Sequence, residues 1–520
     1  MTLKYFSVID DATATGRHEL ARIGVAMIFI VLIMLFLGIR FGDVSYILVV
    51  AGIIGAYMAM NIGANDVANN VGPAVGARAL TMVGAIVIAV IFEASGAMLA
   101  GGDVVATVKK GIIEPGTTIG PEPFVWLMLA AMLAAALWLN IATALGAPIS
   151  TTHSIIGGVL GSGVAAGGWQ VVNWSTVGSI AASWVISPLI GGAIAATFLL
   201  LIKRTITYQS DRILAAKRVV PLLVGLMAWA FATYLALKGL KNVWNVDFAT
   251  AAGLGLVVAA TIYFPARRAV HRAAADIPND KHGVNRLFTV PLIFAAALLS
   301  FSHGANDVAN AVGPLAAIAD SVLSGTVASK ATIPVWVMAI GALGIAVGLA
   351  LFGPKLIRTV GSEITDMDQM RAFSIAMAAA LTVIAASQLG LPVSSTHIAV
   401  GGVFGVGFLR EYIKSTHARM LDEIRLHHQG SDKAVVENFL IEYESGTLER
   451  KGEMLRLLKS GSSVPHLTRK ERKRLKKLYR KALVKRAALL KIVAAWFVTL
   501  PASASMAAGL YLLIRGIMLP

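Results

Sequence analysis

The same heptapeptide, Gly-Ala-Asn-Asp-Val-Ala-Asn, occurs twice in this chain, at Gly63–Asn69 and again at Gly304–Asn310. Each copy lies within an apolar stretch and continues into Val-Gly-Pro. A second motif is also repeated: Pro148–His153 (Pro-Ile-Ser-Thr-Thr-His) and Pro392–His397 (Pro-Val-Ser-Ser-Thr-His) each precede a glycine-rich apolar run. Aspartate and asparagine are costly at membrane depth. Two related halves, each with polar breaks in its hydrophobic segments, are typical of secondary transporters.

The composition is that of an integral membrane protein. Of 520 residues, 57% are apolar and only 14% are charged, and the mean hydropathy is +0.75; a soluble chain carries about 25% charged residues. The absence of cysteine excludes disulfides, thiol catalysis and iron–sulfur clusters. The net charge of +17 is concentrated, because residues 410–491 hold 21 Lys and Arg against 10 Asp and Glu. Basic residues placed beside apolar spans indicate how the chain is oriented in the membrane, rather than nucleic-acid binding.

The apolar runs predict an all-α integral membrane protein with about twelve core helices plus an extra N-terminal helix. Runs near the ~20 residues that cross a bilayer lie at 23–39, 44–64, 80–100, 124–145, 175–202, 219–239, 247–265, 288–303, 334–352, 372–389 and 488–516. The two Pro-Ser-Thr segments, near 146–166 and 391–409, are shorter and are predicted to form helical hairpins. No small-residue cleavage site follows the first span, so we interpret it as a retained anchor rather than a cleaved signal peptide.

Alignment of the halves gives two repeats of five segments, joined by the spans at 219–239 and 247–265. An odd number of crossings per repeat with an even linker makes the repeats inverted, provided that each Pro-Ser-Thr segment counts as one net crossing. With the N-terminus inside, the basic loops 203–218 and 266–287 and the insert 410–487 all lie in the cytoplasm, as the positive-inside rule requires. The predicted domains are the N-terminal segment and anchor (1–40), the first repeat (41–202), the linker (203–287), the first part of the second repeat (288–409), the basic cytoplasmic insert (410–487) and the last helix (488–520).

The insert ends in a basic segment. Thr468-Arg-Lys-Glu471 is a capping-box pattern, and Arg469–Lys491 is predicted to continue as a helix into the last span. Two interpretations stay open: a solvated face near anionic lipid head groups, or a surface for regulation or partner docking.

The repeated acidic motif predicts a cation site. Asp66 and Asn69 are three residues apart and share a helix face, as do Asp307 and Asn310. Carboxylate and amide oxygens are hard ligands suited to Na⁺ or H⁺, and no cysteine or histidine–carboxylate cluster in the sequence suggests a transition metal. Gly63 and Gly304, each followed ten residues later by a proline, suggest helix ends or breaks there. The alternative is that these side chains only cap and tie together broken helices. We predict cation binding at Asp66, Asn69, Asp307 and Asn310, with Na⁺ at Asp66 and Asp307.

The repeated hydroxyl motif predicts an anion site. A proline with Ser and Thr beside it is typical of a helix N-terminus, where free N–H groups and the helix dipole bind oxyanions. Ordinary capping and interhelical hydroxyl bonds are the alternative. An anion beside two aspartates needs cations between them, so the two motifs together indicate cation–anion cotransport. The predicted anion-binding residues are Ser150, Thr151, Thr152, Ser394, Ser395, Thr396, Asn65 and Asn306.

Three further polar residues are possible accessory groups. Glu93 lies alone in the span 80–100 and is either a functional carboxylate or a protonated structural acid. His153 and His397 could relay protons, although hydrogen bonding between helices is the simpler interpretation. Ser150 with His153 lacks a third orienting acid and a Gly-x-Ser-x-Gly turn, so a hydrolase is not indicated. The chain is predicted not to be an enzyme.

Together these motifs resemble the inorganic phosphate transporter (PiT) family, which includes sodium-dependent phosphate symporters. Ten of eleven positions match between Gly63–Pro73 and Gly304–Pro314, and the resemblance extends to Ile91-Phe-Glu93 and Trp184…Pro188. It implies two inverted repeats, phosphate held by the Ser/Thr hairpins and the Asp/Asn segments, Na⁺ or H⁺ coupling, alternating access and a homodimer. The extra N-terminal span and the insert are additions to that core. The Ala372–Met377 stretch lacks the acid that some relatives carry, so a symmetrical role for Glu93 is not implied.

We therefore predict a multi-pass protein of the cell (inner or plasma) membrane that imports inorganic phosphate with a coupling cation, Na⁺ rather than H⁺, and has no other cofactor. Its partners would be phosphate, the cation and anionic lipid head groups, with no nucleic acid. The alternatives are a sulfate importer on the same scaffold and an uncoupled anion channel or phosphate sensor. The paired aspartates argue against a simple anion channel, because they would repel the permeant ion.

Overall fold

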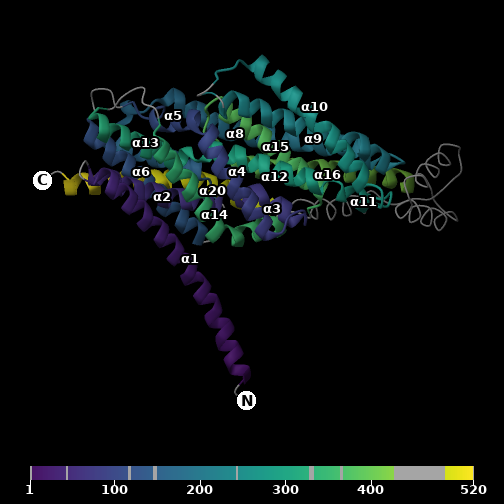
Figure 1. The fold of residues 1–520 in the computed structure, drawn as a ribbon, viewed down its shortest axis with the longest axis horizontal. Helices are drawn as coiled ribbons and strands as arrows, with labels where there is room; N and C mark the ends of the chain where they lie inside the picture. The colour runs from purple at the N-terminus through teal and green to yellow at the C-terminus, as the bar shows by residue number, and fades with distance from the viewer. Residues whose placement is uncertain are drawn as a thin grey trace.

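The computed structural model describes residues 3–42, 45–114, 119–144, 149–239, 241, 244–326, 333–363, 367–426 and 486–518. Over these residues the chain is helical, with one isolated β-bridge between Ile113 and Val172. The α-helices are α1 (Leu3–Phe41), α2 (Tyr46–Asn65), α3 (Ala68–Gly76), α4 (Met82–Ala100), α5 (Gly102–Lys110), α6 (Pro121–Ala144), α7 (Thr151–Gly167), α8 (Trp174–Ile202), α9 (Arg212–Tyr234), α10 (Phe248–Ala273), α11 (Lys281–Arg286), α12 (Thr289–Asp307), α13 (Ala309–Ser324), α14 (Val335–Glu363), α15 (Gln369–Gln388), α16 (Ser395–Leu426) and α20 (Arg486–Met518). Figure 1 shows them as an elongated bundle.

The helices confirm a multi-pass membrane protein. Within the described residues, eleven helical stretches are long and apolar enough to cross a membrane, from Glu19–Phe41 to Phe497–Met518. The first of them belongs to α1, which lies at the edge of the bundle against α2 (Figure 1). The inverted orientation of the two halves stays a prediction.

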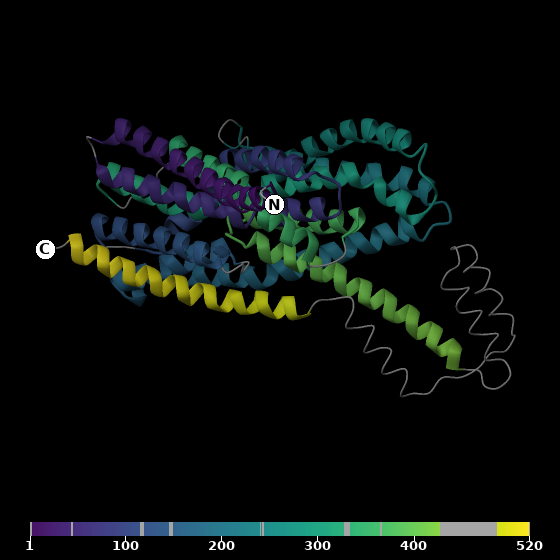
Figure 2. The same cartoon turned by 90° about the horizontal axis from the view of Figure 1, so that it is seen from below.

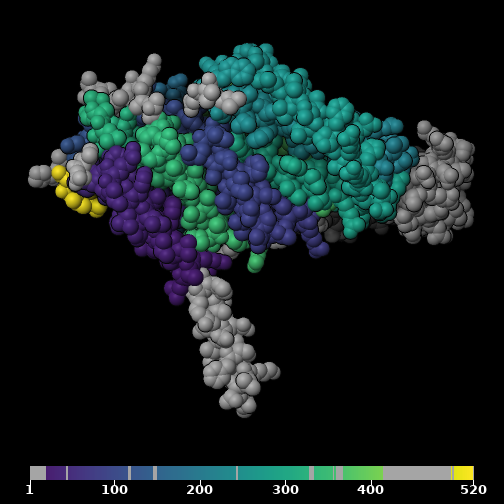
Figure 3. Space-filling model, viewed as in Figure 1, coloured from purple at the N-terminus to yellow at the C-terminus, as the bar shows by residue number. Residues whose placement is uncertain are grey.

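Helices of the two halves interleave in pairs. Helix α4 of the first half packs against α12 of the second, and α14 of the second half packs against α2 of the first. In the same way α8 packs against α16, and α20 packs against α7. Figure 3 shows this as green second-half segments lying between purple and blue first-half segments on one face. Each half therefore depends on the other to bury its helices.

Glycines bring equivalent backbones into direct contact. A Cβ on Gly96 would lie 1.9 Å from the carbonyl oxygen of Phe301, and one on Gly348 would lie 1.9 Å from that of Met60. Phe301 and Met60 each precede the glycine of a heptapeptide by three residues. Close helix approach at small residues is typical of membrane bundles. These matched contacts mean that Glu93, three residues before Gly96, corresponds in position to Ile345, three residues before Gly348.

Each heptapeptide interrupts a helix, as its sequence predicted. Helix α2 ends at Asn65 and α3 begins at Ala68, while α12 and α13 are separated only by Val308. The breaks fall at the aspartates rather than at Gly63 and Gly304. Those glycines serve packing instead, because a Cβ at Gly63 would lie 1.9 Å from the backbone oxygen of Ile345.

The Pro-Ser-Thr segments form the second helices of two hairpins. Helix α6 packs against α7, and α15 packs against α16, each the next helix along the chain. The predicted end of the second segment at 409 was wrong, since α16 continues to Leu426 into the region assigned to the insert. Residues 410–426 contain few helix breakers, so the helix extends beyond the apolar run. The rest of the insert, with the capping box at 468–471 and most of the basic helix, lies outside the described residues.

Candidate functional site

Four chain segments meet at the centre of the bundle: the breaks at α2/α3 and α12/α13, and the N-termini of the hairpin helices α7 and α16. All of their polar side chains are buried, with exposed fractions of 1% for Asp66 and Asp307. The sequence-predicted acidic and hydroxyl motifs therefore lie together, although they are separated by up to 330 residues.

Asp66 receives a hydroxyl from each hairpin. Thr151 of α7 donates to Asp66 Oδ2 at 2.6 Å, and Thr396 of α16 donates to Asp66 Oδ1 at 3.2 Å. The carboxylate therefore connects the two hairpins through charge-assisted hydrogen bonds, which are stronger than neutral ones.

The second half repeats part of this pattern. Ser395 donates to Asp307 Oδ2 at 3.3 Å, as Thr151 does to Asp66. The Asn310 amide donates to the hydroxyls of Thr151 and Thr152 at 3.1 and 3.2 Å, and the Asn69 amide donates to Thr396 at 2.8 Å. Each asparagine thus contacts the hairpin encoded in the other half of the chain.

The hairpin helices begin as their sequences predicted. Ser150 Oγ accepts the His153 N–H at 3.2 Å, and Ser394 Oγ accepts the His397 N–H at 3.3 Å. These N-caps use only one of the four N–H groups that a helix start leaves without an internal partner. The remaining first-turn N–H groups, on the residues that carry the site hydroxyls, are available to an anion.

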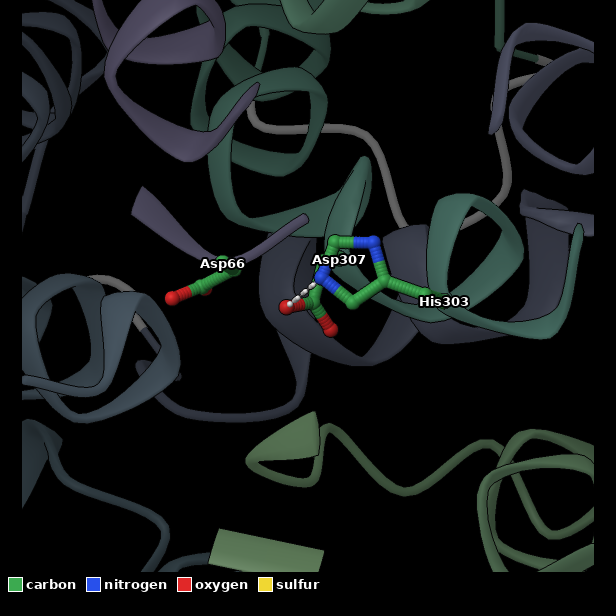
Figure 4. A group of neighbouring side chains, drawn as sticks. All are labelled: Asp66, His303 and Asp307. Carbon is green, nitrogen blue, oxygen red and sulfur yellow. Dashed lines mark ion pairs between the residues drawn. The ribbon is translucent and has the colours of Figure 1, made fainter. Parts of the chain in front are cut away.

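His303, which no sequence motif singled out, lies between two carboxylates. Its Nδ1 is 2.7 Å from Glu93 Oε2 and its Nε2 is 3.0 Å from Asp307 Oδ2, and the ring is fully buried. Figure 4 shows the imidazole pointing at Asp307 with Asp66 beside them. Asp66, His303 and Asp307 offer ligand atoms within 4.8 Å of one another. The statement that the chain has no histidine–carboxylate cluster was therefore wrong.

Asn70 was also missed. Its amide donates to Glu93 Oε1 at 2.7 Å, so the two oxygens of Glu93 are held by one residue from each half. Both missed residues lack a polar copy: His303 corresponds to Ile62 and Asn70 to Ala311. A histidine in an apolar run immediately before the second heptapeptide was the signal that could have identified the first of them.

Several predicted residues lie beside the site rather than in it. Asn306 donates to Ser387 Oγ at the end of α15 and to Leu391 O in the loop before α16, and it accepts the N–H of Val393 in that loop. Asn65 is buried, and its amide nitrogen has no hydrogen-bond partner in the described part of the chain. His153 and His397 lie behind the hydroxyl motifs, with their rings 4.5 Å apart and that of His153 3.9 Å from Trp184.

The arrangement suits a pair of opposite charges. Carboxylate, amide and hydroxyl oxygens can coordinate a small cation, while hydroxyl and amide hydrogens with helix N-termini can hold an oxyanion. Two carboxylates alone would repel that oxyanion across a few ångströms in a medium of low dielectric constant. A cation and an anion bound here together would therefore stabilise each other.

Comparison with known proteins gives consistent results. The sequence profile described as "Phosphate transporter family" matches residues 62–507. "Putative phosphate permease" of Helicobacter pylori (strain J99) is 48% identical over 524 residues, covering 98% of both chains. A relative so named from Pyrococcus abyssi is 40% identical over 360 residues, covering 69% of this chain and 88% of its own. The solved structure of "The sodium-dependent phosphate transporter" superposes with a TM-score of 0.75 at 32% identity, covering 91% of this chain and all of the other.

Proposed function

This chain belongs to the phosphate transporter family, and from that premise we propose that it imports inorganic phosphate by secondary active symport with a cation, Na⁺ in preference to H⁺. The observation that carries the proposal is the pair of hydrogen bonds to Asp66 from Thr151 and Thr396. One carboxylate there contacts both hydroxyl motifs, so a cation at Asp66 would change the environment of both.

In this proposal the cations bind at Asp66 and Asp307, assisted by Asn69 and Asn310. Phosphate binds between the first turns of α7 and α16, to the hydroxyls of Thr151, Thr152, Ser395 and Thr396 and to free N–H groups. Ser150 and Ser394 act by capping the helices, and Asn306 acts by fixing the loop before α16. In the structure these hydroxyls donate to the carboxylates of Asp66 and Asp307. A cation bound at each aspartate would take their place there, so that the hydroxyls can donate to phosphate.

Transport would proceed by alternating access. The hairpins that carry the hydroxyls are separate elements from the broken helices that carry the aspartates, so relative movement of these elements opens and closes the site. The interleaved packing of the halves supports this arrangement, since each hairpin contacts helices from both of them.

Na⁺ coupling is supported by the similarity to a solved structure described as sodium-dependent. Coupling to H⁺ is the second candidate, and one observation favours it: the titratable ring of His303 lies between two buried carboxyl groups, hydrogen-bonded to Glu93 through Nδ1 and with Nε2 3.0 Å from Asp307 Oδ2. Sulfate import and uncoupled anion conduction or sensing are the remaining alternatives.

Uptake of ³²P-phosphate into proteoliposomes of the purified protein tests the proposal. An inward Na⁺ gradient is compared with an inward H⁺ gradient, each with excess unlabelled sulfate. We expect Na⁺-driven accumulation that sulfate does not inhibit. Accumulation driven only by H⁺ would show that H⁺, not Na⁺, is the coupling ion. Uptake of labelled sulfate without phosphate uptake would show that the substrate is sulfate. Equilibration of phosphate without dependence on either gradient would identify a channel.

Two variants locate the cation sites. Asp66→Asn and Asp307→Asn each keep the side-chain shape and remove one charge, and we expect both to abolish concentrative uptake while the protein still inserts. Asp276→Asn, a change of the same kind at an exposed position between α10 and α11, is the control. Normal accumulation by both site variants would contradict the assignment.

A further inference from the structure

A loop of six residues, Gln388–Val393, leads from α15 to the second hydroxyl motif. Helix α15 ends at Gln388, and Gly390 then adopts a left-handed conformation with a φ of 67°. The Leu391 N–H donates back to Ala386 O at 3.0 Å, as in a Schellman motif. The chain continues without further helix to the N-cap of α16.

Five carbonyl oxygens of this loop accept hydrogen bonds from side chains of five different helical elements. The pairs are Lys238 to Gln388 O at 3.2 Å, Thr107 to Gly390 O at 2.7 Å, Asn306 to Leu391 O at 3.1 Å, Trp184 to Pro392 O at 3.2 Å and Thr152 to Val393 O at 3.0 Å. The donors belong to α5, α7, α8, α12 and the helical turn Leu235–Gly239 that continues α9. The loop is therefore fixed along its length by elements of both halves.

The loop is attached to the buried end of a long helix. Helix α16 has 32 residues, and Figure 2 shows its far end beyond the N-terminal end of α20. Its first turn carries Ser395 and Thr396, whose hydroxyls donate to the two site carboxylates at 3.3 and 3.2 Å. The position of these hydroxyls relative to Asp66 and Asp307 therefore depends on what holds the loop.

Lys238 is the charged donor among the five. Its side chain is only 9% exposed, and its ammonium also pairs with the carboxylate of Asp103 on α5. Lys241, whose side chain is 49% exposed, binds the same carboxylate at 2.7 Å but makes no hydrogen bond to the loop among the described residues. A hydrogen bond from a charged donor is stronger than one from a neutral donor. Lys238 and Lys241 therefore share an ion-pair partner and differ in their contact with the loop.

Helix α5 also contacts the loop directly. Thr107 lies one turn after Asp103 on α5 and donates to Gly390 O. A Cβ on Gly390 would lie 3.4 Å from Thr107 Oγ1 and 3.6 Å from Asp103 O, so the loop packs against this helix. One turn of α5 thus holds the loop twice, through Thr107 and through the ammonium that Asp103 binds.

We propose that Lys238 and Thr107 are positioning residues of the phosphate site, which hold the loop so that the second hydroxyl motif faces Asp66 and Asp307. This inference rests on the proposed function. Both residues lie outside the duplicated motifs, and they act through the hydroxyls of α16 rather than by contact with the anion.

Equilibrium dialysis of ³²P-phosphate against the full-length protein in detergent, at saturating Na⁺, tests the inference. Lys238→Met should raise the phosphate Kd about fivefold, the equivalent of ~1 kcal/mol. Lys241→Met is the matched control, because it removes the other lysine from the same carboxylate, and it should leave the Kd within about twofold of wild type.

Thr107→Val removes the second donor with little change in volume and should raise the Kd in the same way. Its control is Thr382→Val on α15, since the Thr382 hydroxyl donates to Ala378 O of its own helix. If Lys238→Met fails to fold, this pair of variants decides the question.

Hydrogen exchange followed by mass spectrometry monitors the loop directly and needs no phosphate. Peptides that cover residues 388–398 should exchange faster in Lys238→Met and Thr107→Val than in either control. A raised Kd without faster exchange would overturn the role of the loop, and equal effects of Lys238→Met and Lys241→Met would assign the change to the ion pair instead.

The same measurements separate this inference from the proposed function. A wild type that binds phosphate, with unchanged affinity in Lys238→Met and Thr107→Val, would overturn the inference alone. A wild type that binds no phosphate would contradict the proposed function, and hydrogen exchange would still decide whether the two residues hold the loop.

Discussion

The Nε2 atom of His303 lies 3.0 Å from Oδ2 of Asp307, one turn further along α12. The other ring nitrogen contacts Glu93 of α4, so a single imidazole connects a carboxylate of the first half to the predicted cation ligand of the second. The corresponding positions around Asp66 are Ile62 and Ile345, which are apolar. The two aspartates of this duplicated site therefore have different surroundings, and only one of them is linked to a buried acid–imidazole pair.

We expect Glu93→Ile and His303→Ile to lower the free energy of unfolding by about 3–5 kcal/mol each, because either change leaves a buried polar partner uncompensated. The double variant Glu93→Ile/His303→Ile reproduces the apolar Ile345–Ile62 pair of the other half. It should recover most of the loss, although Asn70 loses its acceptor and Asp307 keeps the Ser395 hydroxyl but not the imidazole. Chemical unfolding in detergent measures the three values. Losses that simply add in the double variant would show that the two side chains are not energetically coupled.

Thr151→Val removes the hydroxyl bound to Asp66 with little change in volume. We expect phosphate uptake to fall at least tenfold, about 1.4 kcal/mol, because the hydroxyl also accepts from Asn310 and is assigned to phosphate. Ser162→Ala on the same helix is the control, since Ser162 donates only to backbone oxygens of its own helix. Equal phosphate uptake by the two variants would contradict the assignment of Thr151 to the phosphate site.

The sequence predicted the parts of the site that are duplicated. Asp66 with Asn69 and the hydroxyl motifs were found because a polar residue repeated at membrane depth is improbable by chance. His303 and Asn70 correspond to apolar residues in the other half, so a comparison of the two halves for repeated polar residues does not identify them. Their common partner, Glu93, lies 210 residues from His303, and no local pattern reports a contact of that range.

The helix ends were predicted less well than the helices. The breaks were expected at Gly63 and Gly304, yet both glycines lie inside helices, because close approach of a neighbouring backbone rather than a turn requires them. The end of α16 was misplaced because apolar content identifies the part of a helix in the membrane, not the polar extension beyond it. The helix starts at the two Pro-Ser-Thr motifs were predicted correctly, since capping depends on neighbouring residues alone.

Gly348→Ala should destabilise the protein by roughly 1–3 kcal/mol, because the added Cβ would lie 1.9 Å from the carbonyl oxygen of Met60 and the two helices must separate. Gly509→Ala in α20 has no neighbour within 4 Å and should be neutral or stabilising by up to ~1 kcal/mol. Thermal unfolding of both variants provides the comparison. A stable Gly348→Ala protein would mean that α2 and α14 can shift without loss.

Asp103 at the start of α5 accepts hydrogen bonds from Lys238 and, at 2.7 Å, from Lys241. Burial alone would raise the pKa of Asp103, but the hydrogen bonds and charges of the two lysines outweigh it and hold the pKa below the ordinary 3.8. Asp103→Asn should therefore cost roughly 1 kcal/mol at neutral pH. This difference should be constant above the unfolded-state pKa and disappear as the pH falls through the folded-state pKa. A difference that grows on acidification would contradict the ion-pair assignment.

The pairing of helices across the two halves also sets an order of events during synthesis. Glu93 enters the membrane with α4, whereas His303 is added 210 residues later. At a synthesis rate of about 5–20 residues per second, roughly 10–40 s pass between the synthesis of Glu93 and that of His303, whose imidazole it contacts in the finished protein. During that interval Asn70, which precedes α4 in the chain, is the one of the two partners of Glu93 that is already present. The second oxygen of Glu93 therefore gains its partner only when α12 arrives.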